Sequence, residues 1–195
     1  MSLYPTSPVP CFPYEIREEG KTISVEFDSG KSQHLRLRRF PKRKIGPLIY
    51  RGLNFNDRKI IYSFFRNYWK NFNSFYFYDW ILREWIDEYV GRGDGSTAIF
   101  DLHSKNTVIQ SLVIYVDGVQ KQLGTHYNFL SGGGIEGADR IQFTSGNIPE
   151  NGALITSDFS GYLRLKAEFY EDSYIERISV PELFDIEITL YEVQW

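Results

Sequence analysis

The chain has few of the residues that most often bind metals or act as nucleophiles. Its 195 residues include one cysteine, Cys11, and three histidines. A lone cysteine excludes a disulfide within the chain and a zinc site made of several thiolates. The histidines form neither an HExxH motif nor any pair four residues apart, so the usual zinc-protease pattern is missing. We therefore expect no metal, no cofactor and no enzymatic activity.

Three weaker chemical signals do not change that expectation. Asp101 and His103 are two residues apart and would share one face of a strand, but no third residue suggests a metal site or a catalytic dyad. Cys11 lies between prolines and has no activating neighbour. The spaced glycines of residues 91–95 lack both the lysine and the strand–helix frame of a phosphate-binding loop.

Long apolar runs and targeting signals are also missing from the sequence. No stretch of about 18 apolar residues is present, as a transmembrane helix would require. The first ten residues have neither the basic patch nor the apolar core of a signal peptide. We expect a protein that is made in a cytoplasm and does not insert into a membrane.

Charge is small in total but uneven along the chain. The formal net charge is −3, yet residues 31–70 hold twelve Lys and Arg against one acid, and residues 136–195 hold twelve acids against four bases. Such asymmetry suits either two solvated faces or a molecule that stacks or forms rings head to tail. The candidate interface residues are the cations of the basic segment: Arg36, Arg38, Arg39, Lys42, Arg43, Lys44 and Arg51. The same cations could instead neutralise nucleic-acid phosphates, although no nucleic-acid-binding module is recognisable.

The first half of the chain predicts an arm, hairpins and one helix. Residues 1–13 hold four of the eight prolines and predict an extended arm, either frayed or laid on a neighbouring molecule. Apolar and polar residues alternate over residues 22–38, which predicts a hairpin with one solvent-exposed face. Residues 40–52 suggest a loop or an edge hairpin. An apolar stripe with helical spacing predicts a helix over about 56–70, with Asn54 or Asn56 as its N-cap.

The remainder predicts a β-rich fold. Phe75 to Trp80 indicates a buried strand, while residues 81–90 suit a short helix or an extended strand equally. We place a boundary between the two halves of the chain in the glycine-rich residues 91–96. We expect residues 14–90 and the β-rich half, residues 91–195, to pack together as one unit. The predicted fold class is mainly β with one principal helix, a β-sandwich or split barrel packed with that helix.

Three segments, taken in order, resemble the distal tail proteins of tailed phages and gene transfer agents. The resemblance covers about residues 12–195. The first segment is Arg51-Gly52-Leu53 before a helix containing Phe64-Phe65, followed by Phe75 to Trp80. The second is Gly93 to Thr97, then Phe100 and Val116 to Gln120. The third is Ile155 to Tyr162, with Ile188 to Val193 at the end.

The resemblance implies a virion structural protein without catalytic activity. It implies a ring, usually a hexamer, that joins the tail tube protein to the baseplate hub protein, with DNA passing through its lumen without specific binding. Such a protein would be located in the virion tail and assembled in the bacterial host cytoplasm. The alternative is a β-sandwich carbohydrate-binding module for host recognition, which would expose a row of Trp and Tyr, with Trp80, Trp85 and Trp195 as candidates.

Overall fold

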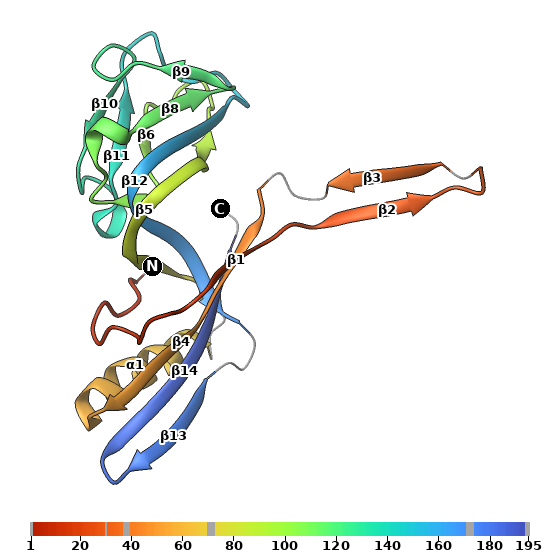
Figure 1. Cartoon of the computed structure of the whole chain (residues 1–195). Coiled ribbons are helices and arrows are strands. Elements are labelled where there is room, and N and C mark those ends of the chain that lie inside the picture. Colours follow the sequence, from red (N-terminus) through yellow and green to blue (C-terminus); the bar gives the residue numbers. More distant parts are fainter. Residues whose placement is uncertain (1, 30, 37–39, 70–72, 171–173, 194–195) are drawn as a thin grey trace. The chain divides into compact units, whose positions relative to one another are not determined.

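The computed structural model describes residues 2–29, 31–36, 40–69, 73–170 and 174–193 (Figure 1). Strands make up 54% of the described residues, and one α-helix lies among them. The chain divides into two compact units. Unit 1 contains residues 3–75 and 166–195, and unit 2 is mainly residues 76–165. The mainly β fold with one helix confirms the predicted fold class.

Unit 1 is built on an antiparallel sheet whose middle strands come from distant parts of the sequence. The order across the sheet is β1, β4, β14 and then the end of β12, and β13 also pairs with β14. Along β4, Ile45, Leu48 and Tyr50 are buried. The bounds of these strands are β1 Ile16–Glu19, β4 Lys42–Leu53, β12 Leu154–Phe169, β13 Ile175–Val180 and β14 Leu183–Glu192.

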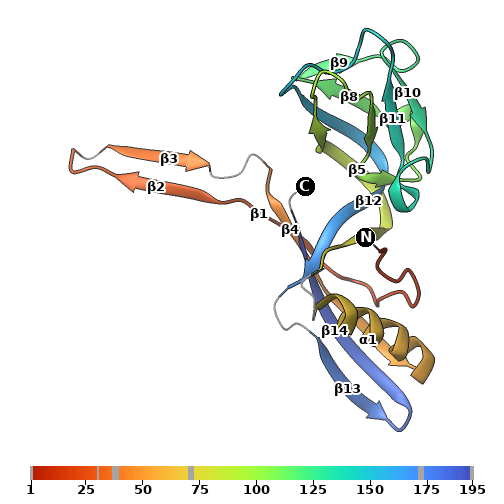
Figure 2. The ribbon, with the colours of Figure 1, turned by 180° about the vertical axis from the view of Figure 1, so that it is seen from behind.

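The helix α1, Phe55–Trp69, lies against β4 and β14 of this sheet (Figure 1 and Figure 2). Asn54 is its N-cap, because the side-chain oxygen of Asn54 accepts hydrogen bonds from the backbone N–H groups of Asn56 and Asp57. Phe65 packs edge-on to Phe169 at 4.9 Å between ring centroids. The predicted helix is therefore confirmed to within one residue at its start, with Asn54 rather than Asn56 as the cap.

The N-terminal arm is held by its own chain, contrary to both sequence expectations. Tyr4 is buried, its hydroxyl is 3.0 Å from that of Tyr50, and its ring packs against Phe64 and Phe75. Further along, the backbone N–H of Cys11 donates to the carbonyl of Ile49. Large aromatic side chains bury enough apolar area to fix an extended segment that makes few backbone hydrogen bonds.

The predicted hairpin is present as β2, Thr22–Glu26, and β3, Ser32–Arg36, with Ile23 opposite Leu35. It differs from expectation in its environment. All five residues of β2 are exposed, including the apolar ones. Alternation predicts correctly that the apolar side chains share a face, but it does not report whether that face is covered.

Strand β4 corrects the expectation of a loop or an edge hairpin over residues 40–52. It lies between β1 and β14 in the sheet. Proline normally argues against such a position. Here Gly46 and Pro47 form a bulge, because Leu48 pairs with Ile188 and Ile45 with Leu190, so that two residues face one on β14. The bulge lets a strand that contains proline remain in the sheet.

Unit 2 contains the remaining strands and two short 3-10 helices. The start of β12 pairs with β8, which pairs with β9 in a tight hairpin, and a separate sheet has the order β10, β11, β6. Both β5 and β7 also pair with β12. The elements are β5 Phe75–Arg92, β6 Ile99–Asp101, β7 Ser104–Lys105, η1 Ile109–Ser111, β8 Val113–Val116, β9 Val119–Lys121, β10 Tyr127–Leu130, η2 Ile135–Gly137 and β11 Arg140–Phe143.

The division into units differs from the predicted boundary at residues 91–96, which lie inside unit 2. Gly93 is tightly packed there, since a Cβ at this position would clash with the carbonyl oxygens of Pro149 and Glu150. The N–H of Gly93 also donates to the carbonyl of Ala153. Gly93 therefore permits close backbone contact rather than marking a linker. Residues 81–90, ambiguous in sequence, continue β5 as a strand.

Candidate assembly surfaces

The structure separates the seven predicted interface residues into three groups. Lys42, Arg43 and Lys44 begin β4, and Arg51 lies exposed near its end. Arg36 ends β3, where it pairs with Thr22. The remaining two predicted residues, Arg38 and Arg39, lie outside the described residues. Among the described residues, the predicted interface cations therefore lie on two strands, β3 and β4.

Arg43 points into unit 1 and is only 8% exposed. Its guanidinium lies 3.1 Å from Glu18 and 3.7 Å from Glu192, and its backbone N–H donates to the Glu192 carboxylate. An arginine placed between two carboxylates is neutralised by its own chain. The sequence-based assignment of Arg43 to a surface interface therefore needs correction, because strand alternation turns it away from Lys42 and Lys44.

Lys42 and Lys44 lie on the opposite face of β4 and each contacts a tyrosine ring. The Lys44 ammonium is 3.8 Å from the centroid of the Tyr170 ring, and the Lys42 ammonium is 5.3 Å from that of Tyr191. The Tyr191 hydroxyl in turn donates to Glu19. These half-buried contacts form a polar face on which the two lysines of β4 lie over tyrosine rings from elsewhere in unit 1.

A second feature of unit 1 is a cleft of about 610 Å³ beside the start of α1. It lies between the helix N-terminus and the turn that joins β13 to β14. Phe55 is 61% exposed there, and Leu183 is also exposed. The residues lining the cleft are Asn54, Phe55, Asn56, Pro181, Glu182, Leu183 and Phe184. Nothing in the hydrophobic spacing of α1 had indicated this cleft, because Phe55 precedes the periodic stripe.

An ion pair holds β13 next to the helix. Arg58 makes a two-pronged contact with Glu176, with nitrogen–oxygen distances of 2.9 and 3.0 Å. The Tyr174 hydroxyl donates to the same carboxylate at 2.6 Å. The hydrogen bonds from Arg58 hold the pKa of Glu176 below its usual range, despite an opposing effect of burial.

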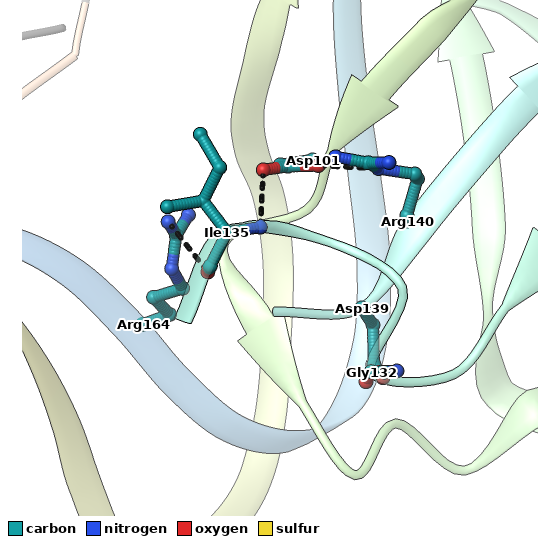
Figure 3. A network of polar contacts seen from close by, with 6 residues as sticks. All are labelled: Asp101, Gly132, Ile135, Asp139, Arg140 and Arg164. Carbon is teal, nitrogen blue, oxygen red and sulfur yellow. Dashed lines mark hydrogen bonds and ion pairs between the residues drawn. The ribbon is translucent and has the colours of Figure 1, made fainter. Parts of the chain in front are cut away.

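Unit 2 contains a polar network around the loop of residues 131–139 (Figure 3). Asp101 accepts hydrogen bonds from the Arg140 side chain at 2.7 Å and from the backbone N–H of Ile135 at 2.9 Å. Arg164, which is 1% exposed, donates to the carbonyl of Ile135. The arrangement fixes the loop from both sides of Ile135, and it assigns Asp101 to Arg140 rather than to a dyad with His103.

Two further groups complete this network. Asp139 is buried and accepts hydrogen bonds from the backbone N–H groups of Gly132 and Thr107. The Tyr78 hydroxyl donates to the carbonyl of Glu136, and burial raises the pKa of Tyr78 to about 12. Each carboxylate thus has defined partners that position backbone, which indicates a structural role.

Aromatic exposure bears on the carbohydrate-binding alternative. Trp80 and Trp85 are both half-buried, and Trp195 lies outside the described residues. Across the described ranges, every Tyr and Trp is buried or half-buried. The row of exposed rings that a glycan platform would need is therefore missing from the part of the chain that the structure describes.

Neither metal binding nor membrane spanning has a candidate within the described ranges. No group of three or more His, Cys, Asp or Glu side chains is placed to hold a metal ion there. No helix among those residues has the length and apolarity to cross a bilayer. Comparison with protein-family models and with curated proteins finds no match for this chain.

Proposed function

We propose that the chain is a structural, ring-forming adaptor at the distal end of a phage-like tail, between the tail tube protein and the baseplate hub protein. The observation that carries the proposal is the order of three family-like segments along nearly the whole chain. The mainly β fold with one helix, as predicted from the sequence pattern, is compatible with such a structural role. In this proposal the ring is a hexamer located in the virion tail and assembled in the bacterial host cytoplasm.

Charge asymmetry supports a head-to-tail arrangement. Lys44 and Arg51 belong to the basic part of the sequence, whereas the last 60 residues carry a net negative charge of −8. A ring requires two different surfaces that fit each other, and opposite charges favour one register over others. The acidic last 60 residues would face the lumen, where their negative charge repels the DNA phosphates and lets the DNA slide through without specific binding. A map of the assembly with a lumen lined mainly by Lys and Arg would contradict that placement.

The test is absolute mass by light scattering after gel filtration, with negative-stain images of the same peak. We expect a mass near six subunits and particles with a central hole. Replacing the exposed Arg51 by Glu should reduce the mass, while the charge-matched change of the exposed Lys59 to Glu should leave it unchanged. Arg43 is kept, because its replacement would disturb the contacts with Glu18 and Glu192 inside the subunit. A wild-type chain that stays monomeric at all concentrations would argue against a self-assembling ring.

A further inference from the structure

The hairpin β2–β3 has an apolar face without a core of its own chain beneath it. The exposed fractions of Ile23, Val25, Phe27 and Leu35 lie between 44% and 56%. Register places Ile23 directly opposite Leu35 on this face. The other face is polar, where the Ser24 hydroxyl lies 2.7 Å from the His34 ring. The hairpin is thus amphipathic, yet both of its faces are open to solvent.

An isolated two-stranded hairpin is marginally stable in water, and it normally needs a packed face to persist. Burying the four apolar side chains would supply that stabilisation, at about 25 cal/mol for each Å² removed from water. Contiguous exposed apolar surface of this kind marks a protein contact. The hairpin is therefore suited to a partner protein.

The cleft beside the start of α1 is a complementary receptor. Its volume of about 610 Å³ suits a few large apolar side chains. Phe55 and Leu183 supply exposed apolar surface in the cleft, and Val180 adds more next to it. The net charges of the two surfaces are opposite in sign, which favours their association. Residues 175–187, which include the turn, hold four acids and one base, whereas residues 21–36 hold three cations and two acids.

We propose that the apolar face of β2–β3 in one copy of the chain docks into the Phe55–Leu183 cleft of a second copy. The contact joins two different patches, so it is heterologous, and its repetition generates a closed ring when the rotation between copies closes. This inference rests on the proposed function, since it names the contact through which the subunits of the ring associate. It also explains why neither patch is covered within one chain.

The first experiment compares the two faces of β2 by substitution. In the full chain, Val25→Glu places a charge on the apolar face, and Ser24→Glu places the same charge on the polar face of the same strand. Both residues are exposed in the single chain, so the fold should tolerate either change. We expect Val25→Glu to weaken self-association at least about tenfold, because an unpaired charge would have to be buried in the cleft. Ser24→Glu should change it little.

The second experiment traps the contact directly. In a Cys11→Ser background, a tagged Val25→Cys chain is mixed with an untagged Leu183→Cys chain under mild oxidation. We expect a disulfide-linked heterodimer of the two chains, and far less of it when Ser24→Cys replaces Val25→Cys. A further sample is one chain that carries both Val25→Cys and Leu183→Cys. If a disulfide forms within that chain but none forms between the two mixed chains, the hairpin folds back on its own cleft and the proposal is overturned.

The outcomes separate this inference from the proposed function. Rings that persist in Val25→Glu, with equal trapping from Val25→Cys and Ser24→Cys, would overturn the hairpin contact and leave the ring adaptor standing. A monomeric wild-type chain with specific trapping at high concentration would support the contact and count against stable self-assembly. A monomeric wild-type chain without specific trapping would overturn both.

Discussion

The guanidinium carbon of Arg164 lies 3.9 Å from the centroid of the Tyr76 ring, and this pair is enclosed within unit 2. A buried cation over an aromatic face, with a hydrogen bond to the Ile135 carbonyl, ties β12 to β5 and to the loop before β11. The two strands and the loop are far apart in sequence. The stability of unit 2 should therefore depend on this one side chain more than on surface cations.

Replacing Arg164 by Met tests that dependence. The change removes the contact with Tyr76 and the hydrogen bond to Ile135, so we expect the free energy of unfolding to fall by about 3 kcal/mol. Urea unfolding followed by near-UV circular dichroism measures the loss. Lys166→Met is the control, because Lys166 is a half-buried cation on the same strand. Equal losses for the two variants would contradict a special role for Arg164.

Gly134→Ala tests the close packing of the loop against Asp101. A Cβ at residue 134 would lie 2.7 Å from an Asp101 carboxylate oxygen, which also receives the Arg140 hydrogen bond. We expect a loss of about 1–3 kcal/mol, the usual effect of overpacking, with thermal unfolding as the measurement. Gly20→Ala should have little effect, since open space surrounds that position. A neutral Gly134→Ala would mean that the loop shifts freely.

The Arg58–Glu176 contact predicts a dependence of stability on pH. Because the folded-state pKa of Glu176 is lowered by hydrogen bonds from Arg58, its stabilising effect is complete at neutral pH. The effect is lost as the pH falls from the unfolded pKa through the folded one, below about pH 4. Glu176→Gln should reduce stability by about 1 kcal/mol at pH 7 and by less at pH 3. If the free energies of unfolding of the wild-type chain and of Glu176→Gln differed by the same amount at pH 7 and at pH 3, this explanation would be contradicted.

Tyr4 predicts that the N-terminal arm contributes to the stability of unit 1. Tyr4→Ala removes a buried ring that contacts Phe64 and Phe75, so we expect a loss of about 3–5 kcal/mol. Phe12→Ala changes an exposed ring in the same arm and should cost far less. Chemical denaturation of both variants gives the comparison. Equal free energies of unfolding for the two variants would contradict a stabilising role of the Tyr4 ring.

The sequence predicts local structure well where the spacing of apolar residues matches the side of the element that is buried in the fold. The helix is anticipated because Ile61 and Phe65 recur with helical spacing and Asn54 can cap it. Strand β4 is missed because Pro47 argues against a strand inside a sheet, and the bulge that accommodates it depends on pairing with β14, which lies far along the chain. Long-range pairing of this kind leaves no local signal.

The candidate surfaces are only partly visible in the sequence. Clustered cations mark Lys42, Arg43 and Lys44 equally, but strand alternation buries Arg43 and leaves the two lysines on tyrosine rings. The apolar face of the hairpin is visible as alternation, although its exposure is not. The cleft at Phe55 and Leu183 brings together two distant segments, and it becomes apparent only in the fold.

The way in which unit 2 interrupts unit 1 sets an order for synthesis. Residues 76–165 lie between the two sequence segments of unit 1. A ribosome therefore completes unit 2 while β4 still lacks its neighbour β14, and the Arg43 contact with Glu192 spans 149 residues. Unit 2 is free to fold on the emerging chain, whereas unit 1 must wait for β14 to leave the exit tunnel. Arrested chains in which residue 165 has just left the exit tunnel should then protect unit 2 from protease and leave the earlier segment open to cleavage.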